Sequence, residues 1–124
     1  MKTSKRIHEI IIKEPWFINA DGSKVTQNWI SKRKRITMFE GGDITAFILY
    51  DINKEESSIY IHFLWVRKDQ RKQGLATTLI NNLLTWNDKC KFFVGYANQN
   101  SEKLFRKLGF SLSKIKYREV FLRR

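Results

Sequence analysis

Residues that bind metals or form cross-links are scarce in this 124-residue sequence. It contains one cysteine, Cys90, and two histidines, His8 and His62. One cysteine cannot form an intrachain disulfide, and so few thiols and imidazoles predict no metal centre. Cys90 follows an expected helix, and we interpret it as a packed side chain rather than a nucleophile. These absences are typical of a cytoplasmic protein.

Long apolar runs are missing as well. No stretch approaches the roughly 20 residues that a membrane-spanning helix needs. The basic start, residues 1–6, is followed by an apolar run that is too short and too interrupted for a signal peptide. We therefore expect no membrane partner. Because there is no internal repeat or linker-like segment, the length predicts a single domain over residues 1–124.

Negative charge is in short supply. Aspartate and glutamate total 12 against 24 lysines and arginines, which gives a net charge of +12. A field of this sign favours anionic partners such as nucleic acid, an acidic surface or a phosphorylated ligand. The densest basic run covers residues 32–35, and two interpretations of it stay open: a solvated sheet edge or a binding patch.

Strand patterns dominate the first two thirds of the chain. Residues 59–66 are almost continuously apolar, which predicts a buried central strand. Strands through 36–38 and 44–52 precede it, joined by the turn signals Gly41-Gly42-Asp43 and residues 53–57, so an antiparallel meander is expected. The β-branched residues of 7–13 predict a further strand. We also expect a strand over 91–97, and over 110–124 one long strand or a break near Ser113.

Two amphipathic helices are expected beside these strands. The first follows Gly74, and its apolar stripe is predicted to comprise Leu75, Ala76, Leu79, Ile80, Leu83 and Trp86. The second would be capped by Asn100 or Ser101 and ended by Gly109, with Leu104, Phe105 and Leu108 buried. Thr26 is predicted to cap a short helix carrying Trp29 and Ile30. The fold class is therefore α/β (α+β), with a mostly antiparallel mixed sheet flanked by helices.

The stretch Val-Arg-Lys-Asp-Gln-Arg-Lys-Gln-Gly-Leu-Ala, residues 66–76, links the buried strand to the first of these helices. Helix N-termini present unpaired backbone N–H groups, and Gly74 would let an anion approach them closely. The neighbouring cations add to this, so the stretch predicts a diphosphate site. It lacks the Gly-Lys-Ser/Thr of a Walker loop and the three glycines of a dinucleotide fingerprint.

Two motifs resemble those of the GNAT superfamily of acyl-CoA-dependent N-acyltransferases. Arg71-x-x-Gly74-x-Ala76 resembles the pyrophosphate-binding R/Q-x-x-G-x-G/A motif. Asn98-x-x-Ser101-x-x-Leu104-Phe105-x-Lys107-x-Gly109-Phe110 is similar to the later N-x-x-A-x-x-L-Y-x-K-x-G-F motif. The resemblance covers residues 36–110 and implies a GNAT-like acetyltransferase domain.

The resemblance implies an N-acetyltransferase in which the acceptor amine attacks acetyl-CoA directly, with acetyl-CoA as cosubstrate and no metal. Strand amides of Leu64, Trp65 and Val66 would polarise the thioester and pair with the pantetheine arm. The implied cosubstrate-binding residues are these three together with Arg71, Lys72, Gln73, Gly74, Leu75, Ala76, Asn98, Ser101 and Phe105.

The candidate catalytic residues are His62, Tyr60 and Tyr96. Tyr60 stands where several family enzymes carry a glutamate, so His62 is the predicted base, with a hydrogen-bonded core histidine as the alternative. Strand alternation is expected to place Tyr60, His62, Leu64 and Val66 on one face. Phe105 replaces the tyrosine that is frequently the general acid, and Tyr96 or solvent would substitute.

Three functions are compatible with the sequence. The first is acetyl transfer to an acceptor that is anionic or carried on nucleic acid, such as an aminoacyl-tRNA or a ribosome-bound protein, by a monomer or homodimer. The second is a nucleic-acid-binding module on the same fold with little or no catalysis, which the net charge and Phe105 favour. The third is a protein that senses acyl-CoA without turnover.

Overall fold

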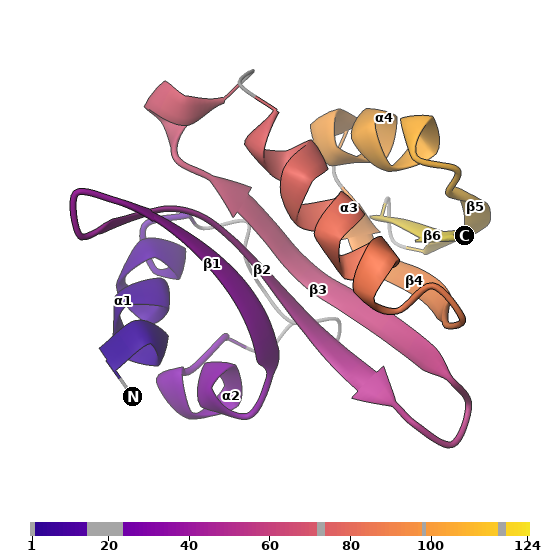
Figure 1. Cartoon of the computed structure of the whole chain (residues 1–124), viewed down its shortest axis with the longest axis horizontal. Helices are drawn as coiled ribbons and strands as arrows, with labels where there is room; N and C mark the ends of the chain where they lie inside the picture. The colour runs from indigo at the N-terminus through magenta and orange to yellow at the C-terminus, as the bar shows by residue number, and fades with distance from the viewer. Residues whose placement is uncertain (1, 15–23, 72–73, 98, 117–118) are drawn as a thin grey trace.

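The computed structural model describes residues 2–14, 24–71, 74–97, 99–116 and 119–124. The elements along the chain (Figure 1) are α1 (Lys2–Ile11), α2 (Gln27–Ser31), β1 (Lys34–Glu40), β2 (Asp43–Asn53), β3 (Ser58–Val66), the 3₁₀ turn η1 (Lys68–Gln70), α3 (Leu75–Trp86), β4 (Lys91–Ala97), α4 (Gln99–Lys107), β5 (Ser111–Lys116) and β6 (Glu119–Arg123). No helix among the described residues is long and apolar enough to cross a membrane.

The strands form one mixed sheet in the order β1-β2-β3-β4-β6-β5. Every neighbouring pair is antiparallel except β3 and β4, which run parallel. The predicted meander of β1, β2 and β3 is confirmed, as is the mostly antiparallel mixed sheet. Its first turn consists of Gly41 and Gly42, whose φ angles of +59° and +84° suit a tight hairpin between twisted strands.

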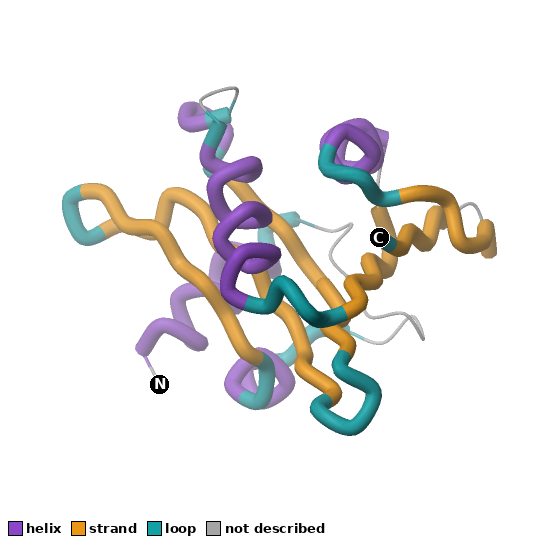
Figure 2. The backbone as a smooth tube through the Cα atoms, turned by 45° about the vertical axis from the view of Figure 1, so that its right-hand side comes forward, coloured by secondary structure: helices purple, strands orange, loops and turns teal. Residues whose placement is uncertain are grey.

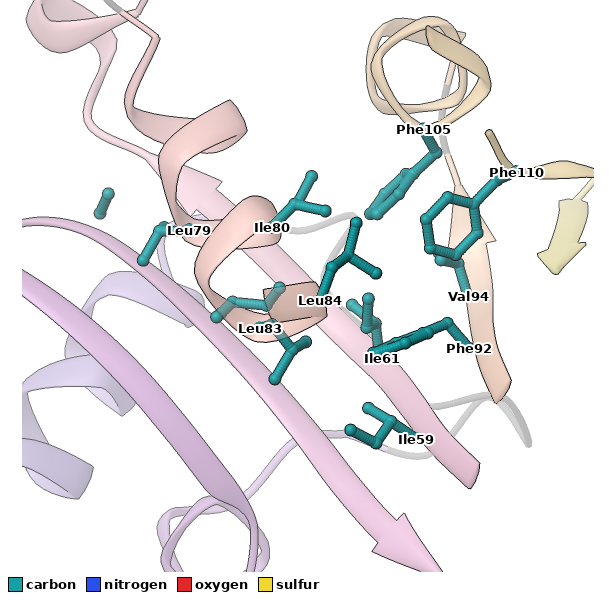
Figure 3. Close-up of a cluster of buried hydrophobic side chains, with 12 residues drawn as sticks. Ile59, Ile61, Leu79, Ile80, Leu83, Leu84, Phe92, Val94, Phe105 and Phe110 are labelled. Carbon is teal, nitrogen blue, oxygen red and sulfur yellow. The ribbon is translucent and has the colours of Figure 1, made fainter. Parts of the chain in front are cut away.

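Helices cover both faces of this sheet (Figure 2): α3 lies in front of it, and α1 and α2 lie behind it. The larger core joins α3 and α4 to β3 and β4 (Figure 3), and its labelled side chains are Ile59, Ile61, Leu79, Ile80, Leu83, Leu84, Phe92, Val94, Phe105 and Phe110. The second core joins α1 and α2 to β2 and β3 through Ile7, Ile11, Val25, Ile30, Ile44, Phe47, Leu49, Phe63 and Trp65.

The apolar stripe of α3 is as predicted over most of its length. Leu79, Ile80 and Leu83 are buried, and Leu84 joins them. Trp86 does not: it is the last residue of the helix and is 64% exposed. The inclusion of Trp86 in the buried stripe was wrong.

The N-terminal segment is a helix, not the predicted strand. In α1 the buried residues are Ser4, Ile7 and Ile11, which recur at the three- and four-residue spacing of one helical face, while Ile12 is exposed. Burial of this face against the second core outweighs the β preference of the isoleucines. The predicted short helix after Thr26 is confirmed as α2, and the Thr26 hydroxyl accepts a hydrogen bond from Trp29 N at 3.1 Å.

Two expectations about the C-terminal third were wrong. The helix α4 begins at Gln99, so Asn100 and Ser101 lie inside it and neither is its cap. The segment after Phe110 forms two strands that separate between Lys116 and Glu119, not near Ser113, where the β5–β6 register instead shifts. The pairing of β6 with β4 on one side and β5 on the other requires this reversal. Gly109, at φ +95°, follows the end of α4 as expected.

A β-bulge interrupts the middle of β3. Leu49 pairs with Phe63 but Tyr50 pairs with Ile61, so His62 is the extra residue. Ile59 and Ile61 consequently pack in the core beneath α3, whereas Phe63 and Trp65 pack in the core beneath α1. The prediction that Tyr60, His62, Leu64 and Val66 share one face was therefore wrong, since Leu64 and Val66 pack against the α3 side.

Candidate active site

The parallel strands β3 and β4 diverge about halfway along their length. Their ladder runs from Ser58 opposite Lys91 to Ile61 opposite Val94, and both strands continue beyond it without further described pairs. Figure 3 shows the two strands diverging from this point. The bulge at His62 comes directly after the last pair, so the bend of β3 and its separation from β4 coincide. A ligand chain could hydrogen-bond to strand backbone exposed in this way.

His62 is held at the separation point by groups from β2 and α2. Its Nε2 lies 2.8 Å from Asp51 Oδ2, and the same oxygen accepts a hydrogen bond from Arg33 Nη1 at 2.5 Å. The Trp29 ring meets the imidazole edge-on, with centroids 5.0 Å apart. Arg33 also lies over the Trp29 ring at 4.8 Å. Contacts from three directions fix the orientation of His62.

These contacts determine how His62 can handle a proton. A carboxylate only accepts hydrogen bonds, so Nε2 carries the hydrogen toward Asp51 and Nδ1 keeps its lone pair. Burial lowers the pKa of His62 below its usual 6.5, the bond to Asp51 opposes this shift in part, and the positive charge of Arg33 adds to it. At neutral pH the imidazole is therefore uncharged and can accept a proton at Nδ1.

Tyr60 lies beside His62, with ring centroids 4.8 Å apart. Its phenol reaches across to β4, because a Cβ atom at Gly95 would lie only 1.9 Å from the Tyr60 hydroxyl oxygen. Gly95 immediately follows the last β3–β4 pair. Because Gly95 has no side chain, the Tyr60 phenol can lie at the point where β3 and β4 diverge.

The N-terminus of α3 lies beyond the end of β3. Gly74 is its N-cap in the left-handed region, φ +78°, with open space where a Cβ would be. The first turn of α3 contains no acidic residue. Arg71 Nε donates a hydrogen bond to Val66 O at 2.9 Å, which holds the Arg71 side chain against the last residue of β3. The helix dipole and unpaired N–H groups make this position favourable for an anion.

The model of the acetyltransferase (GNAT) family matches residues 5–110 of the chain. The chain belongs to the GNAT acetyltransferase family. The match extends the resemblance from the motif region back into α1, and it confirms, at the level of the family, the expectation of an N-acetyltransferase.

Solved structures of acetyltransferases share the GNAT fold of this chain. An aminoglycoside 6'-N-acetyltransferase complexed with coenzyme A is 10% identical over 98% of this chain and 89% of its own, with a TM-score of 0.76. An acetyltransferase from Thermus thermophilus is 16% identical over 99% and 90%, at 0.74. The ribosomal-protein-S18-alanine N-acetyltransferase from Escherichia coli is 14% identical over 81% and 76%, at 0.66. No curated protein sequence matches significantly.

Two residues that were predicted to bind the cosubstrate, Phe105 and Trp65, have buried side chains. Phe105, at the position of the family's tyrosine, is 1% exposed and packs edge-on against Phe110 at 5.1 Å in the core beneath α3. Trp65 is buried on the α1 side, where its ring stacks on Phe47 and its indole donates to Glu14. Any contact that Trp65 makes with a cosubstrate in the strand gap would thus come from its backbone.

Several predicted GNAT site residues lie wholly or partly outside the described part of the chain. Lys72, Gln73 and Asn98 lie outside the described residues. Tyr96 belongs to β4 and Ser101 to α4, but their side chains are not among those described. Leu75 and Ala76 form the first turn of α3 beside Gly74. No group of three metal-ligating side chains occurs within the described ranges.

Asp51, Arg33 and Trp29 are the side chains that sequence analysis did not assign to the site. A signal for Asp51 was available, because a turn over residues 54–57 places Asp51 opposite Tyr60 and hence near His62. Arg33 gave no such signal, since it belongs to a run of four basic residues. Only the position of α2 against β3 distinguishes it from its neighbours.

Proposed function

We propose that the chain transfers an acetyl group from acetyl-CoA to an acceptor amine by direct attack on the thioester. The main support is the neutral imidazole of His62, which Asp51 orients beside the point where β3 and β4 separate. The amine nitrogen bonds to the carbonyl carbon, the carbon–sulfur bond breaks, and CoA leaves as a thiolate that takes up a proton.

Proton removal from the amine is the larger of the two protonation costs. An alkylamine has a pKa of about 10.4 and a thiol of about 8.5, so at pH 7 freeing the amine costs about 4–5 kcal/mol and releasing thiolate about 2. A base is therefore more useful than an acid. In this proposal His62 Nδ1 accepts the amine proton, directly or through water, and Asp51 stabilises the imidazolium that forms.

Arg33 has a different role in the proposal. Arg33 forms an ion pair with the same Asp51 oxygen that contacts His62, and its positive charge lowers the pKa of His62. With Asp51 alone, the pKa of His62 would be higher, and a smaller fraction of the imidazole would be unprotonated and able to accept a proton at neutral pH. Arg33 is therefore a positioning residue that keeps the imidazole neutral before the acceptor arrives.

The remaining parts of the proposal concern the cosubstrate. The backbone of β3 near Leu64 to Val66 would polarise the thioester and pair with the pantetheine arm, and the α3 N-terminus would bind the diphosphate. Because Phe105 lies in the core without a hydroxyl, solvent or Tyr96 would protonate the thiolate. The low cost of that step fits the loss of the tyrosine.

The experiment that tests the proposal is acetyl-CoA turnover, followed as free thiol with a panel of amines. Gly74→Glu should abolish CoA binding in calorimetry, because it places a side chain and a negative charge at the diphosphate site. Gly41→Glu is the matched control, since Gly41 also has a positive φ (+59°) and open space but lies in the β1–β2 hairpin. If folded Gly74→Glu bound CoA as tightly as folded Gly41→Glu, the diphosphate site at the α3 N-terminus would be contradicted.

The acceptor that we propose is anionic or carried on nucleic acid. The support is the net charge of +12, which would repel polycationic amines and attract anions. Within the 32–35 run, Lys32 and Lys34 are exposed, whereas Arg33 is tied to Asp51. The alternative is a binding module without catalysis. Thiol release with any amine would exclude that alternative.

A further inference from the structure

The strand β1 is one edge of the sheet, and in the described part of the chain it pairs only with β2. An exposed strand edge presents unpaired N–H and C=O groups that can pair with another strand. This edge also carries Phe39, which is 51% exposed. Neither Lys34 nor Glu40, at the two ends of β1, forms an ion pair with another described residue.

The sequence of β1 is complementary to itself when reversed. In an antiparallel pair of two β1 strands centred on Thr37, Lys34 lies opposite Glu40 of the other copy, Arg35 opposite Phe39, and Ile36 opposite Met38. Residues directly opposite one another share a face and contact each other. Each pair occurs twice because the arrangement has two-fold symmetry.

The faces on which these pairs would lie are already defined by the fold. Ile36 and Met38 pack at the margin of the core beneath α3, so Lys34 and Glu40, which have the same parity, lie on that face. Phe39 lies on the opposite face, where the Arg6 guanidinium is 5.7 Å from its ring. Arg35 of a second copy would supply a second cation to the same ring.

Glu40 has no cation directly opposite it on β2. Its cross-strand neighbour there is Asp43, which has the same charge and is itself paired with Arg6. Within the described part of the chain, Glu40 interacts with Arg67, whose pKa is raised by its bond to Asp69 and further by the charge of Glu40. Lys34 of a second copy would add a cation directly opposite Glu40. A parallel pairing in register would instead place Lys34 against Lys34 and Glu40 against Glu40. The charges therefore select the antiparallel register.

We propose that the β1 edge binds a second copy of this chain, antiparallel about Thr37, which makes a two-fold dimer with one sheet continuous across both subunits. This proposal is independent of the proposed catalytic function. The interface is short, and its specificity comes from the two Lys34–Glu40 pairs and the two Arg35–Phe39 pairs.

The test uses two charge reversals at exposed positions. Lys34→Glu places glutamate against glutamate in both symmetry-related pairs, and Glu40→Lys places lysine against lysine. Each variant should weaken dimerisation roughly tenfold or more in sedimentation velocity, because two attractive pairs become two repulsive ones. An equimolar mixture of the two variants should form a heterodimer, since both of its pairs are again glutamate with lysine.

The double variant Lys34→Glu/Glu40→Lys should dimerise as the unmodified chain does, and circular dichroism should show that each variant folds. A chain that sediments as a monomer at about 100 µM or above would overturn the proposal. So would single variants that dimerise normally, or a mixture that stays monomeric.

Discussion

At the scale of the residue, His62 combines a partly buried imidazole with one carboxylate and one guanidinium. His62→Gln should lower turnover at neutral pH by about 10²-fold or more, with partial recovery as pH rises and the amine loses its proton without help. The pH–rate profile of acetyl transfer measures both effects. Wild-type turnover of the variant across pH 6–9 would make His62 a structural residue, and Tyr60 would be examined next.

The lowered pKa of His62 also links folding stability to pH. A group whose pKa is lower in the folded state binds protons more readily when unfolded, so protonation favours unfolding. The stability contribution is therefore complete above about pH 6.5 and declines as pH falls from there toward the folded-state pKa. In denaturant titrations at pH 7.5 and 5.5, the unmodified chain should lose more stability than His62→Gln. An identical loss in both would mean that His62 is not responsible.

Phe105 leads to a third prediction, on turnover and stability together. Phe105→Tyr should leave turnover equal or higher, because it restores the family's tyrosine for a proton transfer to the thiolate that is already inexpensive. It should also lower the free energy of unfolding by about 1–3 kcal/mol if the added hydroxyl stays unpaired in the core. Steady-state kinetics and urea unfolding measure the two effects separately. A severe loss of turnover in a stable variant would mean that Phe105 packing itself shapes the site.

The sequence indicated the proton acceptor but not its environment. His62 could be selected because the only other histidine, His8, belongs to a different segment. Its face could not be predicted, because a single bulged residue reverses strand alternation and leaves no composition signal. The partnership of Arg33 with Asp51 depends on how α2 packs against β3, which no local pattern encodes.

At the scale of the element, α2 contributes more to the site than its five residues suggest. Thr26 caps it, Trp29 contacts His62, and Arg33 lies two residues beyond its end. Thr26→Ala should cost about 0.5–2 kcal/mol of stability and lower turnover through loss of His62 orientation, while Thr26→Ser should retain the cap. The unfolding free energy and kcat of the unmodified chain, Thr26→Ala and Thr26→Ser test this expectation. An alanine variant with unchanged kcat would show that Trp29 and Arg33 do not need the cap.

Elements with strong turn or periodicity signals were predictable, and elements defined by tertiary pairing were not. The two hairpins of the meander have glycine or polar turns, and α3 has a clear helical stripe, so both were expected correctly. In α1, helical and strand patterns compete in a short isoleucine-rich segment, and the second core decides between them. The reversal between β5 and β6 has neither glycine nor proline, and only the sheet order requires it.

At the scale of the whole molecule, the charge surplus predicts salt-dependent binding of nucleic acid. Affinity should fall steeply as salt rises, because each neutralised phosphate releases counterions. Lys32→Glu should weaken binding, whereas Lys54→Glu, an equal change of charge in the β2–β3 turn, should weaken it less. Fluorescence anisotropy with a labelled RNA at about 50 and 200 mM salt measures this. No binding at low salt, with efficient acetylation of a cationic small molecule, would contradict the anionic-acceptor proposal.

The contact between Tyr60 and Gly95 couples two positions 35 residues apart, so that substitutions at one depend on the residue at the other. A methyl group at position 95 is incompatible with the phenol as placed, so Gly95→Ala should be costly beside Tyr60 and nearly neutral in a Tyr60→Ala background. The coupling free energy of such a double-mutant cycle should be about 0.5–3 kcal/mol. In descendants of this chain, a larger residue at position 95 should therefore appear only after Tyr60 has been lost, so the order of the two substitutions is set by geometry.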